Sequence, residues 1–203
     1  MPAFVVPFRG SGAKRRLQPL AEDARRELAR AMLADVLAAC TATGPTHLVT
    51  DDEQAAALGR EAGATWVDDP GGGQGAAVAA GLGRVPGGPV LVVNADLPCV
   101  QPRDLWALLG ALPVDGLALV GASDGSTNAL ALARPSLFEP LYGTGSAARF
   151  GAHAAERGVR AVAAAIPNLV ADVDSLADLR RVEARVGEHT RAVLERRRAE
   201  LAA

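Results

Sequence analysis

Short apolar runs recur along the chain, and each is bounded by glycine, proline, aspartate or asparagine. Runs of this length favour β-strands, and because most are apolar throughout rather than alternating, they are typical of strands covered on both faces. The pattern predicts strands at 3–8, 46–50, 64–67, 89–93, 117–121, 128–133 and 169–173.

Segments with a helical period lie between several of these strands. The clearest is 20–37, where an apolar residue recurs every four positions beside charged ones: Leu20, Ala24, Leu28, Met32 and Val36. This spacing predicts an amphipathic helix. Further helices are predicted at 53–62, 74–84, 102–111, 146–157 and 175–186, with a charged C-terminal helix at about 188–203.

Strands that alternate with helices predict a three-layer α/β/α fold with a mainly parallel, mixed sheet. No internal repeat or linker interrupts the pattern, and Gly/Pro-rich stretches such as 68–75 and 84–89 lie between elements rather than between domains. A length of 203 residues with 49% hydrophobic content suits one domain with a substantial core. We therefore expect a single domain spanning 1–203.

The charge and cysteine content exclude several classes of function. A net charge of −2 provides no global basic field that would gather nucleic acid or an anionic membrane. No apolar run approaches the ~18 residues that a membrane span needs. Cys40 and Cys99 show no metal-type spacing and suit reduced thiols. These features predict a cytoplasmic protein that binds neither nucleic acid nor membrane.

The first candidate site residue follows the strand in "VLVVNADLPCV" (90–100), which runs from four apolar residues into Asn94 and Asp96. In sheets of this kind, ligands bind beyond the carboxyl ends of the strands, which is where Asp96 falls. Asp96 lies six residues before Pro102, too early to cap the helix predicted there. A simple turn residue remains an alternative, because Asp and Pro are common in turns.

A second pair of carboxylates occurs in "VADVDSLADL" (170–179), where Asp172 and Asp174 stand two apart at the end of a predicted strand and so on one face of it. Ser175 and Asp178 form a capping box for the next helix, and Asp174 could serve only as a turn residue before it. Two strand ends that deliver carboxylates suit Mg²⁺, which takes one or two protein carboxylates and completes its shell with water and substrate phosphates.

The third candidate is the N-terminal loop "PFRGSGAKRRLQP" (7–19). Its glycines let backbone N–H groups approach phosphate oxygens, and its basic side chains supply positive charge. The loop matches neither the Walker A pattern nor G-x-G-x-x-G, which argues against a dinucleotide-binding domain. Taken alone, it could be a solvated basic turn.

Six segments in order carry a family resemblance: "KRRL", "DPGGGQGAAVAAGL", "NADLPCV", "STNALALARP", "YGTGSAARFGAHAAERG" and "VADVDSLADLRRV". Over 4–190 the chain resembles the 2-phospho-L-lactate guanylyltransferases of coenzyme F420 biosynthesis and their actinobacterial relatives that use phosphoenolpyruvate. "ADLP" and "DVDS-x-x-DL" are shared widely among nucleotidyltransferases of glycosyltransferase-A-like, Rossmann-like fold. "TNAL" followed by "G-x-G-S-A-A-R" is more specific.

The resemblance implies transfer of GMP from GTP to the phosphate of phosphoenolpyruvate or 2-phospho-L-lactate, with release of pyrophosphate. It implies one or two Mg²⁺ ions held by Asp96, Asp172 and Asp174, and catalysis by Lys14, Arg16 and Asp96. The implied nucleotide-binding residues are Arg9, Gly10, Ser11, Gly12, Lys14, Gly72, Gly73 and Gln74. The implied acceptor-binding residues are Thr127, Asn128, Gly143 and Ser146. Thr127 and Asn128 open a predicted strand, whereas Gly143 and Ser146 stand at a helix start whose N–H groups we expect to be unpaired and to favour an anion. Ser146 as a simple N-cap is the alternative.

Three positions depart from the family pattern. Arg9 stands where Lys is common, Gly73-Gln74-Gly75 replaces a Gly-Leu-Asn step in the base-binding loop, and Phe150 replaces a His. The altered loop predicts modest discrimination between bases. A phosphate acceptor is mostly a dianion at pH 7, so the reaction needs no catalytic His.

Alternative functions keep the fold and change the ligand. The acceptor could be 3-phosphoglycerate or a molybdopterin- or sugar-phosphate-type substrate, although the Leu-Ala-Gly-Gly opening of those relatives is missing. A non-catalytic nucleotide-binding domain is a further alternative. The sequence leaves the oligomeric state open and is compatible with a homodimer.

Overall fold

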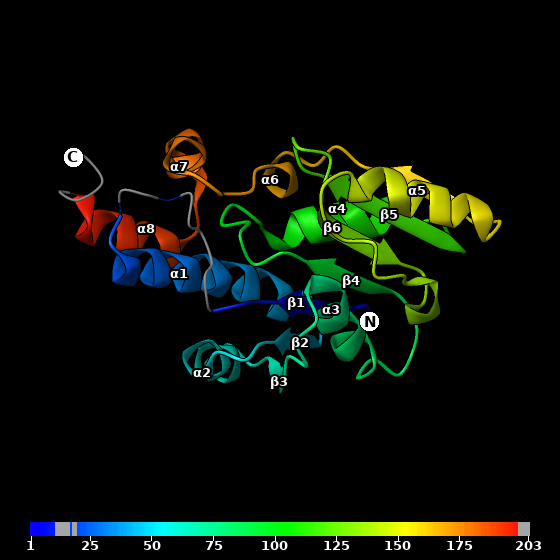
Figure 1. The fold of residues 1–203 in the computed structure, drawn as a ribbon, viewed down its shortest axis with the longest axis horizontal. Coiled ribbons are helices and arrows are strands. Elements are labelled where there is room, and N and C mark those ends of the chain that lie inside the picture. The colour runs from blue at the N-terminus through cyan, green and yellow to red at the C-terminus, as the bar shows by residue number, and fades with distance from the viewer. Residues whose placement is uncertain (11–16, 18–19, 199–203) are drawn as a thin grey trace.

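The computed structural model describes residues 1–10, 17 and 20–198. Within them, seven strands form one sheet in the order β3-β2-β1-β4-β6-β5-β7 (Figure 1). β6 runs antiparallel to β4 and β5, and the other neighbouring pairs are parallel. This confirms the predicted mixed, mainly parallel sheet. The strands are β1 (Ala3–Pro7), β2 (Thr46–Val49), β3 (Thr65–Val67), β4 (Val90–Val93), β5 (Gly116–Gly121), β6 (Thr127–Leu132) and β7 (Arg160–Ala163).

Helices cover both faces of the sheet. They are α1 (Glu22–Thr41), α2 (Glu53–Glu61), α3 (Gln74–Leu82), α4 (Pro102–Ala111), α5 (Ser146–Glu156), α6 (Pro167–Val170), α7 (Leu176–Val182) and α8 (Glu188–Arg196), with 3₁₀ turns at Pro135–Leu137 and Glu183–Arg185. Successive strand residues point to opposite faces. Phe4 and Val6 pack in a cluster with α1, α2, α4 and α6, whereas Val5 packs in another with α3 and α5. The three-layer prediction is therefore confirmed.

A third apolar cluster lies beyond the sheet, where α8 packs along α1 (Figure 1). The buried carboxylate of Asp35 on α1 accepts hydrogen bonds from the backbone N–H groups of His189 and Thr190, at 2.9 and 3.0 Å. These are two of the N–H groups that the first turn of a helix leaves without intrahelical partners. Val173 belongs to the same cluster, so this docking also holds the chain that carries Asp172 and Asp174.

Two predicted elements differ from the structure. The strand predicted at 169–173 is wrong: α6 occupies Pro167–Val170 and a loop follows it. Pro167 takes the first position of that helix, where its missing N–H costs nothing. The remaining strand is β7, which the apolar pattern missed because none of its four positions is buried.

The other predicted elements are present with small changes in their bounds. The long helix begins at Glu22 and ends at Thr41 rather than spanning 20–37, and the predicted helix at 175–186 consists of α7 and a 3₁₀ turn. Across the described ranges, no helix combines the length and the apolar character needed to cross a membrane.

Candidate active site

A pocket of about 220 Å³ opens between β1 and β4, at the carboxyl ends of these parallel strands. From β1 the chain proceeds to β2 and β3 on one side, and β4 then pairs with the other side of β1. Such a switch in strand order is where open α/β sheets bind ligands. The described residues that line the pocket are Pro7, Phe8, Arg9, Ala29, Met32, Gln74, Ala77, Asn94, Ala95 and Asp96.

Asp96 lies in the turn after β4 and lines this pocket. It does not cap α4, because the N-cap there is Gln101, which forms a capping box with Asp104. The backbone N–H of Val173 donates to the carbonyl of Asp96 at 3.0 Å. The structure thus brings together the two carboxylate-bearing segments that the sequence places far apart.

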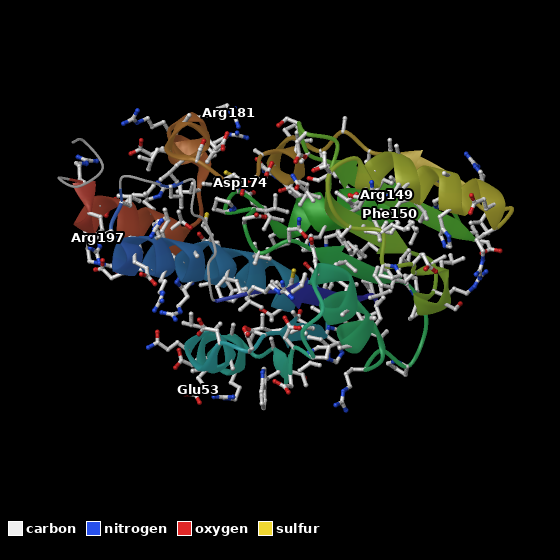
Figure 2. All side chains as sticks on the ribbon, in the orientation of Figure 1. Glu53, Arg149, Phe150, Asp174, Arg181 and Arg197 are labelled. Carbon is white, nitrogen blue, oxygen red and sulfur yellow. The ribbon has the colours of Figure 1, made fainter. Side chains whose placement is uncertain are left out.

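The geometry around Asp172 differs from the sequence argument in one respect. Asp172 and Asp174 do not leave one face of a strand, since they lie in the loop between α6 and α7; Figure 2 labels Asp174 there. Burial raises the pKa of Asp172, and the negative charges of Asp96 and Asp174 raise it further, against the opposing hydrogen bond from Asn128. The site therefore concentrates negative charge.

The donor chemistry of this cluster fits a hard cation. Carboxylate oxygens are the protein ligands that Mg²⁺ prefers, and one or two are enough when substrate phosphates complete the shell. In the parts of the chain that the structure describes, no group of three or more His, Cys, Asp or Glu side chains surrounds a common metal position. A cation at this site would therefore depend on substrate oxygens as well as on the protein.

Asn128 on β6 connects the sheet to the Asp172 loop. Its buried side-chain amide donates to the carbonyl of Leu169 at 3.0 Å, lies 3.3 Å from that of Val170, and reaches a carboxylate oxygen of Asp172 at 3.2 Å. These contacts hold the end of α6 and orient Asp172. The side chain predicted to bind the acceptor thus faces the carboxylate loop.

The helix start at α5 differs from the expectation. Gly145, in the left-handed conformation (φ 73°), is the N-cap, so Ser146 is not one. The N–H groups of Ser146 and Ala147 are not unpaired: they donate to the carbonyls of Gly143 and Gly125, at 3.0 and 3.1 Å. The prediction of free N–H groups is therefore wrong for these two residues, because loop carbonyls fold back onto the helix end.

Ser146 and Thr127 form a buried hydroxyl pair with an Oγ–Oγ1 distance of 2.9 Å. One hydroxyl donates to the other, so the mutual bond uses one of their two protons and leaves the second for another acceptor. The pair joins the start of β6 to the start of α5. Their assignment to the phospho-acid site stays a prediction.

Arg149 on α5 holds the loop that precedes its own helix. Its guanidinium donates to the carbonyls of Leu141, Tyr142 and Thr144, with the shortest distance, 2.7 Å, at Thr144. Figure 2 labels Arg149 beside Phe150 on this helix. Sequence reasoning missed this role, although Arg149 stands in the "G-x-G-S-A-A-R" motif, because a side chain's return to its own loop leaves no periodic signal.

The glycine-rich segment before α3 takes conformations that favour glycine, with φ of 82° at Gly72 and 106° at Gly73. A Cβ at Gly75 would come within 2.6 Å of the side chain of Pro140. The departure at position 75 therefore has a packing reason. Gln74 begins α3, and its Nε2 donates to Oδ1 of Asn94 at 2.7 Å.

The other two departures from the family pattern also have places in the structure. Arg9 lines the pocket and pairs with the almost fully buried carboxylate of Asp69 at 3.6 Å. Phe150 is buried and packs edge-on against Tyr142, with the ring centroids 5.4 Å apart. An apolar ring thus fills the position where a His was expected.

The remainder of the N-terminal loop is described only in part. At Gly10, Asp52 fills the space that a Cβ would need, so the loop starts close to the N-terminus of α2. The predicted phosphate-binding residues Ser11, Gly12, Lys14 and Arg16 lie outside the described residues.

Open α/β sheets bind nucleotides and other ligands at a switch-point pocket of this kind, and the nearby carboxylates suit a cation that also takes phosphate oxygens. The sequence profile of the MobA-like NTP transferase domain family matches residues 12–165. The chain is 38% identical to a phosphoenolpyruvate guanylyltransferase of Geodermatophilus obscurus, over 96% of this chain and 92% of that protein. It is also 38% identical to one of Streptomyces coelicolor, over 95% of each.

Solved structures of similar fold extend the same picture. A Desulfovibrio desulfuricans protein named as a nucleotide-diphospho-sugar transferase has a TM-score of 0.78, with 15% identity over 99% of this chain and 96% of that one. Glucosyl-3-phosphoglycerate synthase of Mycobacterium tuberculosis, solved with Mn²⁺ and uridine diphosphate, has a TM-score of 0.59, with 13% identity over 79% of this chain and 68% of that one. The chain is a nucleotidyltransferase. It belongs to the MobA-like NTP transferase domain family and, within it, to the family of the phosphoenolpyruvate guanylyltransferases.

Proposed function

We propose that this protein transfers GMP from GTP to the phosphate of a small phosphorylated carboxylic acid, phosphoenolpyruvate or 2-phospho-L-lactate, in coenzyme F420 biosynthesis. The names of the relatives support the reaction. The structural observation that carries it is the hydrogen bond from Val173 to Asp96, since it brings the Asp172–Asp174 loop to the switch-point pocket.

The nucleotide occupies the pocket between β1 and β4 in this proposal. The apolar side chains of Phe8 and Met32 cover a base, and the glycines at 72 and 73 allow the backbone to approach the ribose. Gln74 contacts the base, and the loop that begins with Arg9 and Gly10 reaches the triphosphate with Ser11, Gly12, Lys14 and Arg16. These basic side chains stabilise the negative charge that develops on the transferring and leaving phosphates.

Asp96, Asp172 and Asp174 hold one or two divalent cations, most simply Mg²⁺, together with oxygens of the nucleotide. A bound cation would neutralise phosphate charge and align the α-phosphate with the attacking oxygen. Asn128 acts on the protein side by fixing the position of Asp172. The raised pKa of Asp172 supports this assignment, because crowded carboxylates are stabilised by a cation between them.

The acceptor approaches from the side of β6 and α5. Its phosphate is mostly a dianion at neutral pH, so no side chain has to remove a proton before attack. Thr127 and Ser146 offer one hydroxyl proton, and Arg149 fixes the loop around Gly143 that closes this side. Asn128 contributes through the Asp172 loop. Rate enhancement then comes mainly from alignment and from charge stabilisation.

Pyrophosphate release tests the proposal directly. The protein is incubated with Mg²⁺, each of GTP, ATP and CTP, and each of phosphoenolpyruvate, 2-phospho-L-lactate and 3-phosphoglycerate. We expect pyrophosphate only when GTP meets one of the first two acceptors. Release with 3-phosphoglycerate would assign another acceptor class. No release in any combination, with nucleotide binding retained, would identify a non-catalytic nucleotide-binding domain.

A further inference from the structure

The polar edge of the nucleotide pocket is formed by two carboxamides in contact, those of Gln74 and Asn94. Both side chains line the pocket and both are partly buried. Apart from Arg9 and Asp96, the other lining residues are apolar, and Phe8 and Met32 among them are almost fully buried. A flat base that enters between such walls is distinguished by the hydrogen bonds at its edge.

The orientation of Asn94 is set by the main chain of β6. Its Nδ2 lies 3.1 Å from the carbonyl oxygen of Thr127, and its backbone N–H donates to the carbonyl of Asn128 at 3.0 Å. A carbonyl oxygen only accepts hydrogen bonds, so the NH₂ end of the Asn94 amide must face Thr127. Oδ1 of Asn94 therefore faces the other way, toward Gln74.

The same logic sets the orientation of Gln74. Because Oδ1 of Asn94 can only accept, the group of Gln74 that lies 2.7 Å from it must be the NH₂ end. Oε1 of Gln74 then remains as a hydrogen-bond acceptor with a fixed position. Turning the Gln74 amide over would place two oxygens against each other at this distance, at the cost of a lost hydrogen bond and a repulsion.

This matters because a carboxamide that turns freely suits both purines. Guanine presents donors at N1 and N2 beside the acceptor O6, whereas adenine presents a donor at N6 beside the acceptor N1. One orientation of an amide matches the first edge, and the opposite orientation matches the second. A fixed amide has only one match.

We propose that Asn94 is a positioning residue that fixes the carboxamide of Gln74, so that Gln74 Oε1 accepts a hydrogen bond from guanine and the pocket rejects adenine. This inference rests on the proposed function, since it places a nucleobase in the pocket. It also replaces the expectation of modest base discrimination: Gln74 in the altered loop supplies the polar contact, and Asn94, directly after β4, fixes the orientation of its amide.

Nucleotide affinities measured without acceptor test the proposal, because they do not depend on turnover. Isothermal titration calorimetry would give Kd for GTP and for ATP in the parent protein, Asn94→Ala, Gln74→Leu and the double variant. We expect the parent to prefer GTP. In each single variant the ratio of Kd for ATP to Kd for GTP should fall about tenfold, equivalent to ~1.4 kcal/mol.

The double variant shows whether Asn94 acts through Gln74. If it does, the double variant should lose no more selectivity than Gln74→Leu alone, because the interaction is already absent. Asn168→Ala is the matched control, since that amide donates to Asp104 of α4 at 3.0 Å and neither residue lines the pocket; the variant should keep the parent ratio. If Asn94 had a purely structural role, Asn94→Ala would lower the affinity for GTP and for ATP equally.

Three outcomes would overturn the inference: a parent protein without preference for GTP, an unchanged ratio in Asn94→Ala, or losses that add in the double variant. The proposed function fails separately. If no acceptor yields pyrophosphate while GTP binds selectively through Gln74 and Asn94, the reaction is wrong and the inference stands. If guanylyl transfer occurs while the ratio of Kd values stays unchanged in Asn94→Ala, the proposed reaction stands and the inference about Asn94 is wrong.

Discussion

Replacing Asp96 by Asn removes one negative charge while it keeps the shape of the side chain. If Asp96 holds a cation against the nucleotide, we expect kcat/KM to fall at least a hundredfold, equivalent to about 2.7 kcal/mol of transition-state stabilisation. Steady-state kinetics in Mg²⁺, together with a thermal melt to verify the fold, measure this effect. Near-parental turnover in the folded variant would remove Asp96 from the site.

Asp115→Asn is a suitable control for that experiment. Asp115 is an exposed carboxylate that pairs with Arg134 and precedes β5. Because β5 runs in the same direction as β4, Asp115 lies at the opposite edge of the sheet from Asp96. Asp115→Asn should keep the parental kinetic constants. Because both variants remove one negative charge, a loss of activity confined to Asp96→Asn reflects the position of the charge and not the change in net charge.

The buried hydroxyl pair leads to a second prediction at this scale. Thr127→Val keeps the volume of the side chain and removes the partner of Ser146. If Ser146 donates to Thr127 and the Thr127 hydroxyl donates to the acceptor, KM for the acceptor should rise about tenfold, equivalent to ~1.4 kcal/mol, with KM for GTP unchanged. Initial rates at varied acceptor and at varied GTP separate the two constants.

Thr190→Val is the matched control, as Thr190 is fully buried and its hydroxyl has no hydrogen-bond partner among the described residues. It should leave both KM values unchanged. A change in GTP affinity alone for Thr127→Val would show that the effect passes through the carbonyl of Thr127 and Asn94. That result would remove the pair from the acceptor site.

At the scale of elements, the limits of the sequence argument can be seen in the segment 169–173. Leu169 and Val173 are both buried, as the predicted strand requires, but they are buried in different clusters: Leu169 beneath the sheet and Val173 against α1, α7 and α8. An apolar pattern in the sequence indicates that a side chain is buried, but it does not indicate which elements that side chain packs against. β1, β2, β4, β5 and β6 were predictable because each lies inside the sheet with its apolar side chains covered.

In the candidate site too, some features could be predicted from the sequence and others depend on tertiary contacts. Asp96 could be found because a carboxylate that ends a buried strand is exceptional. The contacts that arrange the site join distant parts of the chain: Asn128 reaches Leu169, Val170 and Asp172. No local spacing encodes such contacts, so they had to come from the tertiary structure.

The docking of α8 on α1 gives a prediction about an element. Asp35→Ala removes the acceptor for two backbone N–H groups and leaves a space in a buried contact. We expect the free energy of unfolding to fall by about 2 kcal/mol. For a domain of this size, that corresponds to a fall in Tm of roughly 4 to 8 °C. Urea denaturation measures the first quantity and a thermal melt the second.

Hydrogen exchange locates the effect of Asp35→Ala. The amides of His189 and Thr190 should lose protection, while amides in β1 and β4 exchange no faster than global unfolding allows. Asp35→Asn, which keeps one acceptor oxygen, should show a smaller loss. Unchanged protection at His189 and Thr190 would mean that apolar packing alone holds α8 in place.

Taken as a whole, the molecule concentrates negative charge at the edge of the sheet where its substrates are expected to bind. The pKa of Asp172 is raised above its ordinary value of 3.8, mainly by burial and then by Asp96 and Asp174. The folded protein therefore holds a proton on Asp172 at pH values where the unfolded chain has lost it. This contribution to stability is largest below pH 3.8 and is lost as the pH rises through the folded pKa.

This charge arrangement makes stability depend on divalent cations at neutral pH. At pH 7.5 without metal, Asp172→Asn should have a higher Tm than the parent, because Asn keeps an acceptor for Asn128 and carries no charge; the difference should shrink toward pH 4. Mg²⁺ at a hundred times its Kd should stabilise the parent by about 2.7 kcal/mol, and it should stabilise Asp172→Asn much less.

Differential scanning fluorimetry at both pH values, with and without Mg²⁺, measures these shifts in Tm. Asp115→Asn is the control variant and should respond to Mg²⁺ as the parent does. An equal response to Mg²⁺ in the parent and in Asp172→Asn would show that Asp172 is not a ligand, and a lower Tm of Asp172→Asn in the metal-free protein at pH 7.5 would show that its charge is compensated within the fold.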